Sequence, residues 1–266
     1  MTTTADERLE TPDGVMTMTT DRNDIPKIYE LGSLPATLRC EHGVLTVDYD
    51  EDSESPRAWV GDTSRSTFYT WMRGYASPDK RPRSLMLEDV VAQLLADIYD
   101  DEDDLVRDVE ALRKGAWQGI DCDEEDVYDF VANEHTMAGV DLISRHIPFR
   151  IVYALIHSDV AYSTSPFGDP WDSGVAGCIF MDKDVFEEDF VRGVGGDRDR
   201  AMIWALGWLD DEVDQYDQWA RGEVYRYDYS PDEGPDDSCG GFYGDDAVSD
   251  MLTMVNDRID AAAADR

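Results

Sequence analysis

Lysine is almost missing from this chain. Only four of its 23 basic residues are lysine, against 60 Asp and Glu, and the formal net charge is −37. Such a charge makes a compact chain repel itself at low ionic strength. At about 1 M salt the Debye length is only about 3 Å, which screens most of that repulsion. The composition therefore predicts a protein of a high-salt cytoplasm, from a halophilic archaeon or from a virus or plasmid of one.

Motifs typical of several function classes are also missing. The sequence contains no P-loop, no G-x-G-x-x-G and no zinc-type ligand spacing, so we predict no cofactor and no metal. No apolar run approaches the ~18 residues that span a membrane, and residues 1–25 are polar, so we expect no membrane contact and no signal peptide. The four cysteines, at 40, 122, 178 and 239, form no C-x-x-C pair. This spacing indicates that the cysteines are reduced, and it does not decide whether two of them form a disulfide.

The acidic residues allow two interpretations. A surface that imitates the DNA backbone is one, and general solvation in high salt is the other. The acids are spread along the whole chain instead of one face or tail, which favours solvation. Direct binding to nucleic acid is not expected, because the only basic cluster, residues 80–83, is short.

Hydrophobic periodicity indicates an α+β fold. Residues 150–156 form a continuous apolar run typical of a central strand, and residues 85–99 place their apolar side chains on one helical stripe. Further strands are predicted at 44–49, 160–163, 176–181 and 224–229. Further helices are predicted at 66–75, 100–115, 123–133, 184–192, 197–221 and 246–261. We expect a single domain with a small, largely antiparallel sheet covered by helices.

The predicted domain covers residues 38–266. Residues 1–37 are interpreted as a flexible N-terminal arm, because most of this segment is polar and shows no periodicity. Residues 78–135 are interpreted as a helical insertion into the domain. The long helix at 197–221 has an apolar stripe that includes Ile203, and an opposite acidic face that we interpret as solvated.

Residues 163–174 form the segment that differs most from its neighbours. Two prolines, two glycines and an Asp-Ser-Gly turn predict a rigid loop between two strands. Phe167 and Trp171 are expected to anchor the loop by burial. Asp169, Asp172 and Ser173 are expected to hydrogen-bond its backbone.

Three blocks of sequence resemble a protein family. They are Asp50 to Trp59; His157-Ser158 with the STxPFxxPWDSG block at 163–174; and Tyr216 to Trp219 with a GxVYxY block at 222–227 and a DSCxGFYG block at 237–244. Together they resemble an uncharacterised family of tailed viruses, plasmids and other mobile elements. The resemblance implies an accessory protein of a mobile element and implies no mechanism. Gly240 departs from the family pattern, in which an aromatic or long residue often follows the cysteine.

Four residues are candidates for chemistry, namely His157, Asp172, Ser173 and Cys239. A histidine that is oriented by a carboxylate and lies beside a serine or cysteine is the arrangement of an activated nucleophile. Ser173 lies outside the G-x-S-x-G elbow of the α/β-hydrolases. Cys239 lies in a Gly-rich segment that predicts a turn, where backbone N–H groups could bind an oxyanion. The structural interpretation is that Asp172 and Ser173 cap the loop, His157 begins a turn and Cys239 is a small buried residue.

We expect a non-enzymatic module that binds a host protein. Its predicted binding residues are Phe167, Asp169, Trp171, Asp172, Ser173, Tyr225, Ser238 and Cys239. The alternative is a small hydrolase or metal-dependent enzyme that uses His157, Asp172 and Cys239. The distances among His157, Asp172 and Cys239 distinguish the two hypotheses, because a general base must lie within hydrogen-bonding reach of the group it deprotonates.

Overall fold

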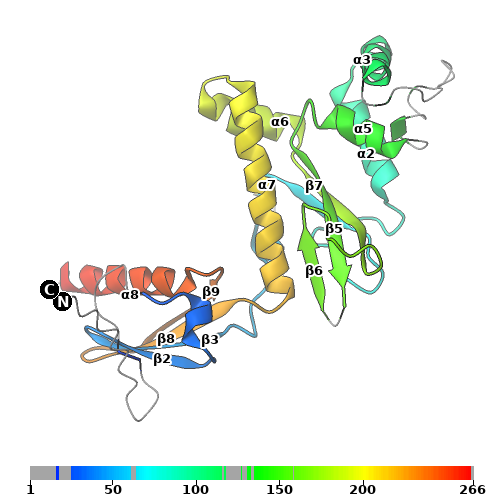
Figure 1. Ribbon diagram of the computed structural model, residues 1–266. Coiled ribbons are helices and arrows are strands. Elements are labelled where there is room, and N and C mark those ends of the chain that lie inside the picture. The colour runs from blue at the N-terminus through cyan, green and yellow to red at the C-terminus, as the bar shows by residue number, and fades with distance from the viewer. Residues whose placement is uncertain are drawn as a thin grey trace, which may run out of the picture. The chain divides into compact units, whose positions relative to one another are not determined.

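The chain has an α+β fold with two largely antiparallel sheets (Figure 1). The computed structural model describes residues 16–17, 25–60, 64–115, 117, 127, 131–132, 135–157 and 159–264. The α+β class is confirmed. Where we expected one small sheet in a domain over 38–266, the chain instead divides into two compact units, each with a sheet and a core of its own. Unit 1 comprises Met1–Glu54 with Gln218–Arg266, and unit 2 comprises Ser55–Asp217.

Unit 1 is a five-stranded sheet covered on one face by a helix. The strand order is β1-β2-β3-β8-β9, and the bounds are Met16–Thr17, Ala36–Cys40, Gly43–Tyr49, Tyr225–Pro231 and Asp237–Phe242. On β8, Tyr225, Tyr227 and Tyr229 are buried while Asp228 and Ser230 are exposed. This alternation places the three tyrosines on the covered face. The helix α8 (Ala247–Ala264) packs its buried apolar side chains against them (Figure 1).

Part of the predicted flexible arm belongs to the core of unit 1. The short helix η1 (Ile28–Leu31) buries Ile28 and Leu31 against the sheet, and the Ile28 amide donates a hydrogen bond to the Asp245 carbonyl at 3.0 Å. Apolar side chains three residues apart lie on one face of a helix, which explains why both are buried. The folded part of unit 1 therefore includes residues that we assigned to the arm.

Unit 2 contains a four-stranded sheet with the order β4-β7-β5-β6. The strands are Thr67–Thr70, Ser173–Phe180, Phe149–Ile156 and Val160–Ser163 in that order. Residues 149, 151, 152 and 154 of β5 are all buried, as the continuous apolar run predicted for a central strand. The predicted helix at 66–75 is wrong, because its first residues form β4. Phe68 and Thr70 are buried and Tyr69 between them is only partly so, which is the period of a strand paired with β7.

Helices at one end of this sheet share its core. The predicted helices at 85–99 and 100–115 are confirmed as α2 (Leu87–Ile98) and α3 (Glu102–Lys114), and α5 (Thr136–Ile143) packs against α2. Their buried leucines and valines form one cluster with Phe149 and Phe180 of the sheet. The helices α2 and α3 of the segment that we interpreted as an insertion therefore share the core of unit 2. Most of the helix predicted at 123–133 lies outside the described residues.

The long helix α7 (Arg198–Ala220) follows a short helical segment, α6 (Lys183–Val185) with η4 (Phe186–Val191) and η5 (Arg192–Val194). Its buried stripe consists of Ala201, Ala205, Leu209, Val213 and Tyr216. Ile203, which we placed on the stripe, is 75% exposed. At this end of the helix Ala201 and Ala205 are the buried residues, whereas Leu209, Val213 and Tyr216 lie on the stripe as the helical spacing predicts.

The acidic residues of α7 are not a purely solvated face. Asp210 forms an ion pair with Arg150 at 2.9 Å, and Asp217 accepts a hydrogen bond from the Tyr162 amide at 2.6 Å. These carboxylates fix α7 to the sheet of unit 2. Among the residues that the structure describes, no helix combines the length and the apolar character needed to cross a membrane.

A buried arginine connects three segments of unit 2. Arg57, in α1 (Pro56–Val60), has a side chain that is only 4% exposed. Its guanidinium binds both carboxylate oxygens of Asp79, at 3.0 and 2.6 Å, and also binds Glu212 of α7. The remaining donors bind the Ser64 and Ser66 hydroxyls and the Ser66 carbonyl. The guanidinium nitrogens therefore all donate to an acceptor. A charged group can be buried in a protein only when it is paired and hydrogen-bonded in this way.

Replacing Arg57 should destabilise unit 2. We expect Arg57→Ala to lower the free energy of unfolding by about 3–5 kcal/mol, because it leaves two carboxylates without a cation. The control is Arg65→Ala, which removes an exposed ion pair with Asp189 and should cost less than about 1 kcal/mol. The measurement is urea unfolding in molar salt, followed by circular dichroism. Equal losses in the two variants would contradict the structural role of Arg57.

Candidate functional site

The loop between β6 and β7 is placed by the topology of the sheet. The strands β6 and β7 lie on opposite sides of β5, so residues 164–172 pass over the end of β5. There the Ile156 amide donates a hydrogen bond to the Asp172 carbonyl at 2.9 Å. The prediction of a loop between two strands is confirmed, and its last residues are held against the central strand.

Side chains of the loop determine its shape. Asp169 accepts hydrogen bonds through Oδ1 from the amides of Trp171, at 2.8 Å, and Asp172, at 3.3 Å. The Ser173 hydroxyl donates to the Asp169 carbonyl. These are the local bonds by which Asp and Ser stabilise turns. The two amide donors, and then the charge of His157, lower the pKa of the Asp169 carboxyl, so it stays ionised.

Trp171 does not anchor the loop by burial. Its side chain is 92% exposed, which is the highest value among the exposed large apolar residues of the described chain, while Phe167 is half-buried. The hydrogen bonds to Asp169 fix the backbone on both sides of Trp171, so the loop keeps its shape without burial of the indole. The structure therefore exposes a large aromatic side chain on a turn that is held by hydrogen bonds.

His157, Asp169 and Asp172 form a cluster at the base of this loop. His157 follows β5, and its Nδ1 lies 3.3 Å from Oδ2 of Asp172. One nitrogen or oxygen atom of each of the three residues lies within 4.8 Å of the corresponding atoms of the other two. The side chains of His157 and Asp172 are 59% and 47% exposed, so the cluster faces solvent. The structure thus brings together two of the four residues proposed for chemistry and adds Asp169.

Ser173 does not complete an activated nucleophile, and Cys239 belongs to the other unit. The Ser173 hydroxyl donates to a backbone carbonyl, so its proton is engaged there and not by the imidazole. Cys239 belongs to unit 1, where it lies on β9 opposite Tyr227. The expected turn around it is therefore wrong, because pairing with β8 extends the Gly-rich segment into a strand. Cys178, a further thiol of unit 2, is buried, which raises its pKa to about 12 and keeps it protonated.

The remaining predicted binding residues belong to unit 1. Tyr225 is buried, with its ring centroid 5.6 Å from that of Tyr49, and Ser238 is exposed on β9. Of the eight predicted binding residues, the structure therefore places four in one loop of unit 2, a fifth, Ser173, at the start of β7, and three in the sheet of unit 1.

An aspartate contact in unit 1 escaped the sequence analysis. Asp50 Oδ2 accepts a hydrogen bond from the Gly241 amide at 3.0 Å. A Cβ atom at Gly240 would collide with the same carboxylate, so a larger residue there would require Asp50 to move. Nearby, Gln218 Oε1 accepts from the Gly244 amide at 2.7 Å. These residues of the first and third blocks hold the backbone of unit 1, and no sequence motif of known function marks them.

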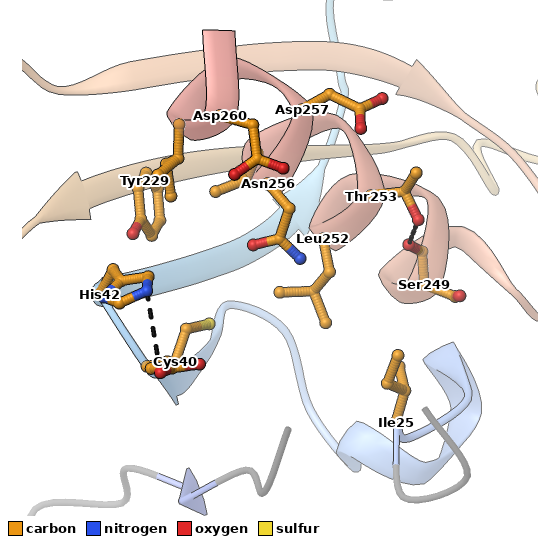
Figure 2. A pocket seen from close by; sticks show the side chains of 13 residues that line it. Ile25, Cys40, His42, Tyr229, Ser249, Leu252, Thr253, Asn256, Asp257 and Asp260 are labelled. Atoms are coloured by element: carbon orange, nitrogen blue, oxygen red, sulfur yellow. Dashed lines mark hydrogen bonds and ion pairs between the residues drawn. The ribbon is translucent and has the colours of Figure 1, made fainter. Parts of the chain in front are cut away.

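A cavity of about 620 Å³ lies between α8 and the β2–β3 hairpin of unit 1 (Figure 2). Leu252 and Asn256 line it from the helix, and Cys40 and His42 line it from the hairpin. Tyr229 closes one side. Its hydroxyl is buried and has no hydrogen-bond partner among the described residues, whereas the hydroxyl of Tyr227 donates to Asp237 at 2.8 Å.

Comparisons with protein-family models, with curated proteins and with solved structures find no match for this chain. The resemblance to a mobile-element family therefore stays a prediction.

The two tyrosines of β8 provide a matched pair of substitutions. Tyr227→Phe should lower the free energy of unfolding by about 1.5–3 kcal/mol, because it removes a hydrogen bond to a carboxylate. Tyr229→Phe should be neutral or stabilising, because it removes a buried hydroxyl that has no described partner. Urea unfolding of both variants in molar salt measures the difference. A larger loss for Tyr229→Phe than for Tyr227→Phe would show that the Tyr229 hydroxyl has a partner in solution.

Proposed function

We propose that this chain is a non-enzymatic protein-binding module of a halophilic virus or mobile element, and that it engages a host protein in a high-salt cytoplasm through the loop at 164–172. The observation that supports this proposal most directly is the exposure of Trp171 on a loop that is already ordered. Tryptophan is enriched among the residues that dominate binding energy in protein interfaces. A single exposed apolar residue is common on protein surfaces, but an exposed indole on a braced turn is suited to insertion into a pocket.

The hydrogen bonds within the loop lower the conformational entropy that is lost when a partner binds. Ordering a mobile loop at an interface consumes part of the interaction energy. Here Asp169 and Ser173 already fix the turn. The chemistry around Trp171 also describes the partner. We expect the partner to offer an apolar pocket that accepts the indole of Trp171.

The acidic DNA-mimic form of this proposal has less support. Asp210, Glu212 and Asp217 of α7 are engaged in ion pairs or hydrogen bonds within unit 2, so they are not free to imitate phosphates. The enzyme alternative keeps the contact between His157 and Asp172, but the Ser173 hydroxyl donates to the Asp169 carbonyl and is not engaged by the imidazole. The aromatic loop is the surface that we therefore assign to the partner.

The proposal is tested by a binding comparison in molar salt. The tagged protein and its Trp171→Ala variant are used to capture partners from a lysate of a halophilic host, with Trp204→Ala as the control. Trp204 is also exposed and lies on α7, away from the loop. We expect one host protein to be retained by the wild type and by Trp204→Ala. Trp171→Ala should lose at least about 2 kcal/mol of affinity, which is roughly a 30-fold rise in Kd.

Circular dichroism of all three proteins shows whether the substitutions leave the fold intact. Equal recovery of the partner by Trp171→Ala would remove the loop from the interface. If no protein is captured by the wild type, the binding function itself is wrong, and the contact between His157 and Asp172 becomes the starting point for assays of hydrolysis.

A further inference from the structure

We propose that His157, Asp169 and Asp172 bind one divalent transition-metal ion of the Zn²⁺ class on the surface of unit 2. The site goes beyond the protein-binding function and does not depend on it. It also differs from the sequence-based expectation that the chain holds no metal, because that expectation rested on ligand spacing along the chain. In the fold the ligands come from two separate connections, the β5–β6 turn and the β6–β7 loop.

The spacing of the donor atoms fits a metal site. Zinc bonds to imidazole nitrogen and carboxylate oxygen are about 2.0–2.2 Å long, so neighbouring donors of one ion lie roughly 3–3.5 Å apart. His157 Nδ1 and Asp172 Oδ2 are 3.3 Å apart, and the donor atoms of all three residues lie within 4.8 Å of one another.

The cluster differs from an ordinary group of surface acids because it contains an imidazole and because its ligands are oriented by other groups. The Oδ1 atom of Asp169 is engaged by two amides, and its Oδ2 atom accepts no hydrogen bond from a described residue. One oxygen of Asp169 thus fixes the carboxylate and the other is available to an ion. Such outer hydrogen bonds orient the ligands of metal sites and raise their affinity.

The backbone beneath the cluster is also fixed. The Ile156 amide donates to the Asp172 carbonyl at 2.9 Å, and the His157 amide donates to the Asp159 carbonyl at 3.1 Å. These bonds attach both connections to the end of the central strand β5. The donors are therefore held close together before an ion arrives, so less ordering is required on binding.

The kinds of donor select the kind of metal. Mg²⁺ and Ca²⁺ prefer oxygen ligands alone, whereas imidazole favours zinc and its neighbours among the transition metals. Three protein ligands leave at least one position of a tetrahedral ion open. We expect Zn²⁺ and Co²⁺ to bind, and we expect Mg²⁺ in large excess not to displace them.

The test uses the full chain, freed of metal by a chelator and kept in molar potassium salt. Zn²⁺ binding is measured by calorimetry, and Co²⁺ binding is measured by its visible absorption, which reports the coordination geometry. We expect one ion per chain. His157→Ala and Asp169→Asn should each weaken Zn²⁺ binding by at least about tenfold.

Matched controls separate this site from binding to the acidic surface in general. His42→Ala removes an exposed histidine of unit 1, and Asp211→Asn removes an exposed carboxylate of α7. Both should bind Zn²⁺ as the wild type does. The proposal is overturned if the wild type binds no Zn²⁺ ion. It is also overturned if the two controls lose as much Zn²⁺ affinity as the two site variants. Displacement of Co²⁺ by Mg²⁺ would equally rule out a site that depends on the imidazole.

Discussion

The ion cluster around Arg57 is the interaction on which unit 2 depends most. A guanidinium buried to this extent must have all its donors satisfied, and here they bind Asp79, Glu212 and two serines. Asp79 in turn accepts a hydrogen bond from the Phe68 amide at 2.7 Å, so the same network also fixes the start of β4. In a chain with 60 acidic and 23 basic residues, cations are scarce, and one of them is placed where three segments meet.

The same imbalance gives the acidic residues two distinct roles. Most of them are exposed and keep the surface hydrated, but several accept hydrogen bonds from backbone amides or arginines. Asp50 holds Gly241 in unit 1, and Asp169 and Asp217 bind amides in unit 2. A count of charges cannot separate these roles. The geometry does so, because a carboxylate with an amide donor within 3 Å constrains the backbone, whereas an exposed one does not.

The predictions that succeeded rest on long local patterns, and those that failed depend on distant contacts. The apolar run of β5 and the stripe of α2 are each unambiguous over a full element. Phe68, Trp71, Met72 and Tyr75 have helical spacing, but pairing with β7 makes the first of them part of a strand. Cys239 lies among glycines and is nevertheless extended by pairing with β8. Likewise, His157, Asp169 and Asp172 meet only because the loop returns over the end of β5, which no spacing along the chain reveals.

The ionic strength of the solvent determines which features of this surface could recognise a partner. At the molar ionic strength that the composition predicts, the Debye length is about 3 Å, so a broad acidic face has little reach. Burial of an indole is not screened in this way, and neither is direct coordination of a metal by an imidazole and two carboxylates. A chain with this composition is therefore expected to place recognition in short-range contacts. The loop at 164–172 offers such contacts, since an exposed tryptophan lies between the two carboxylates that we propose as metal ligands.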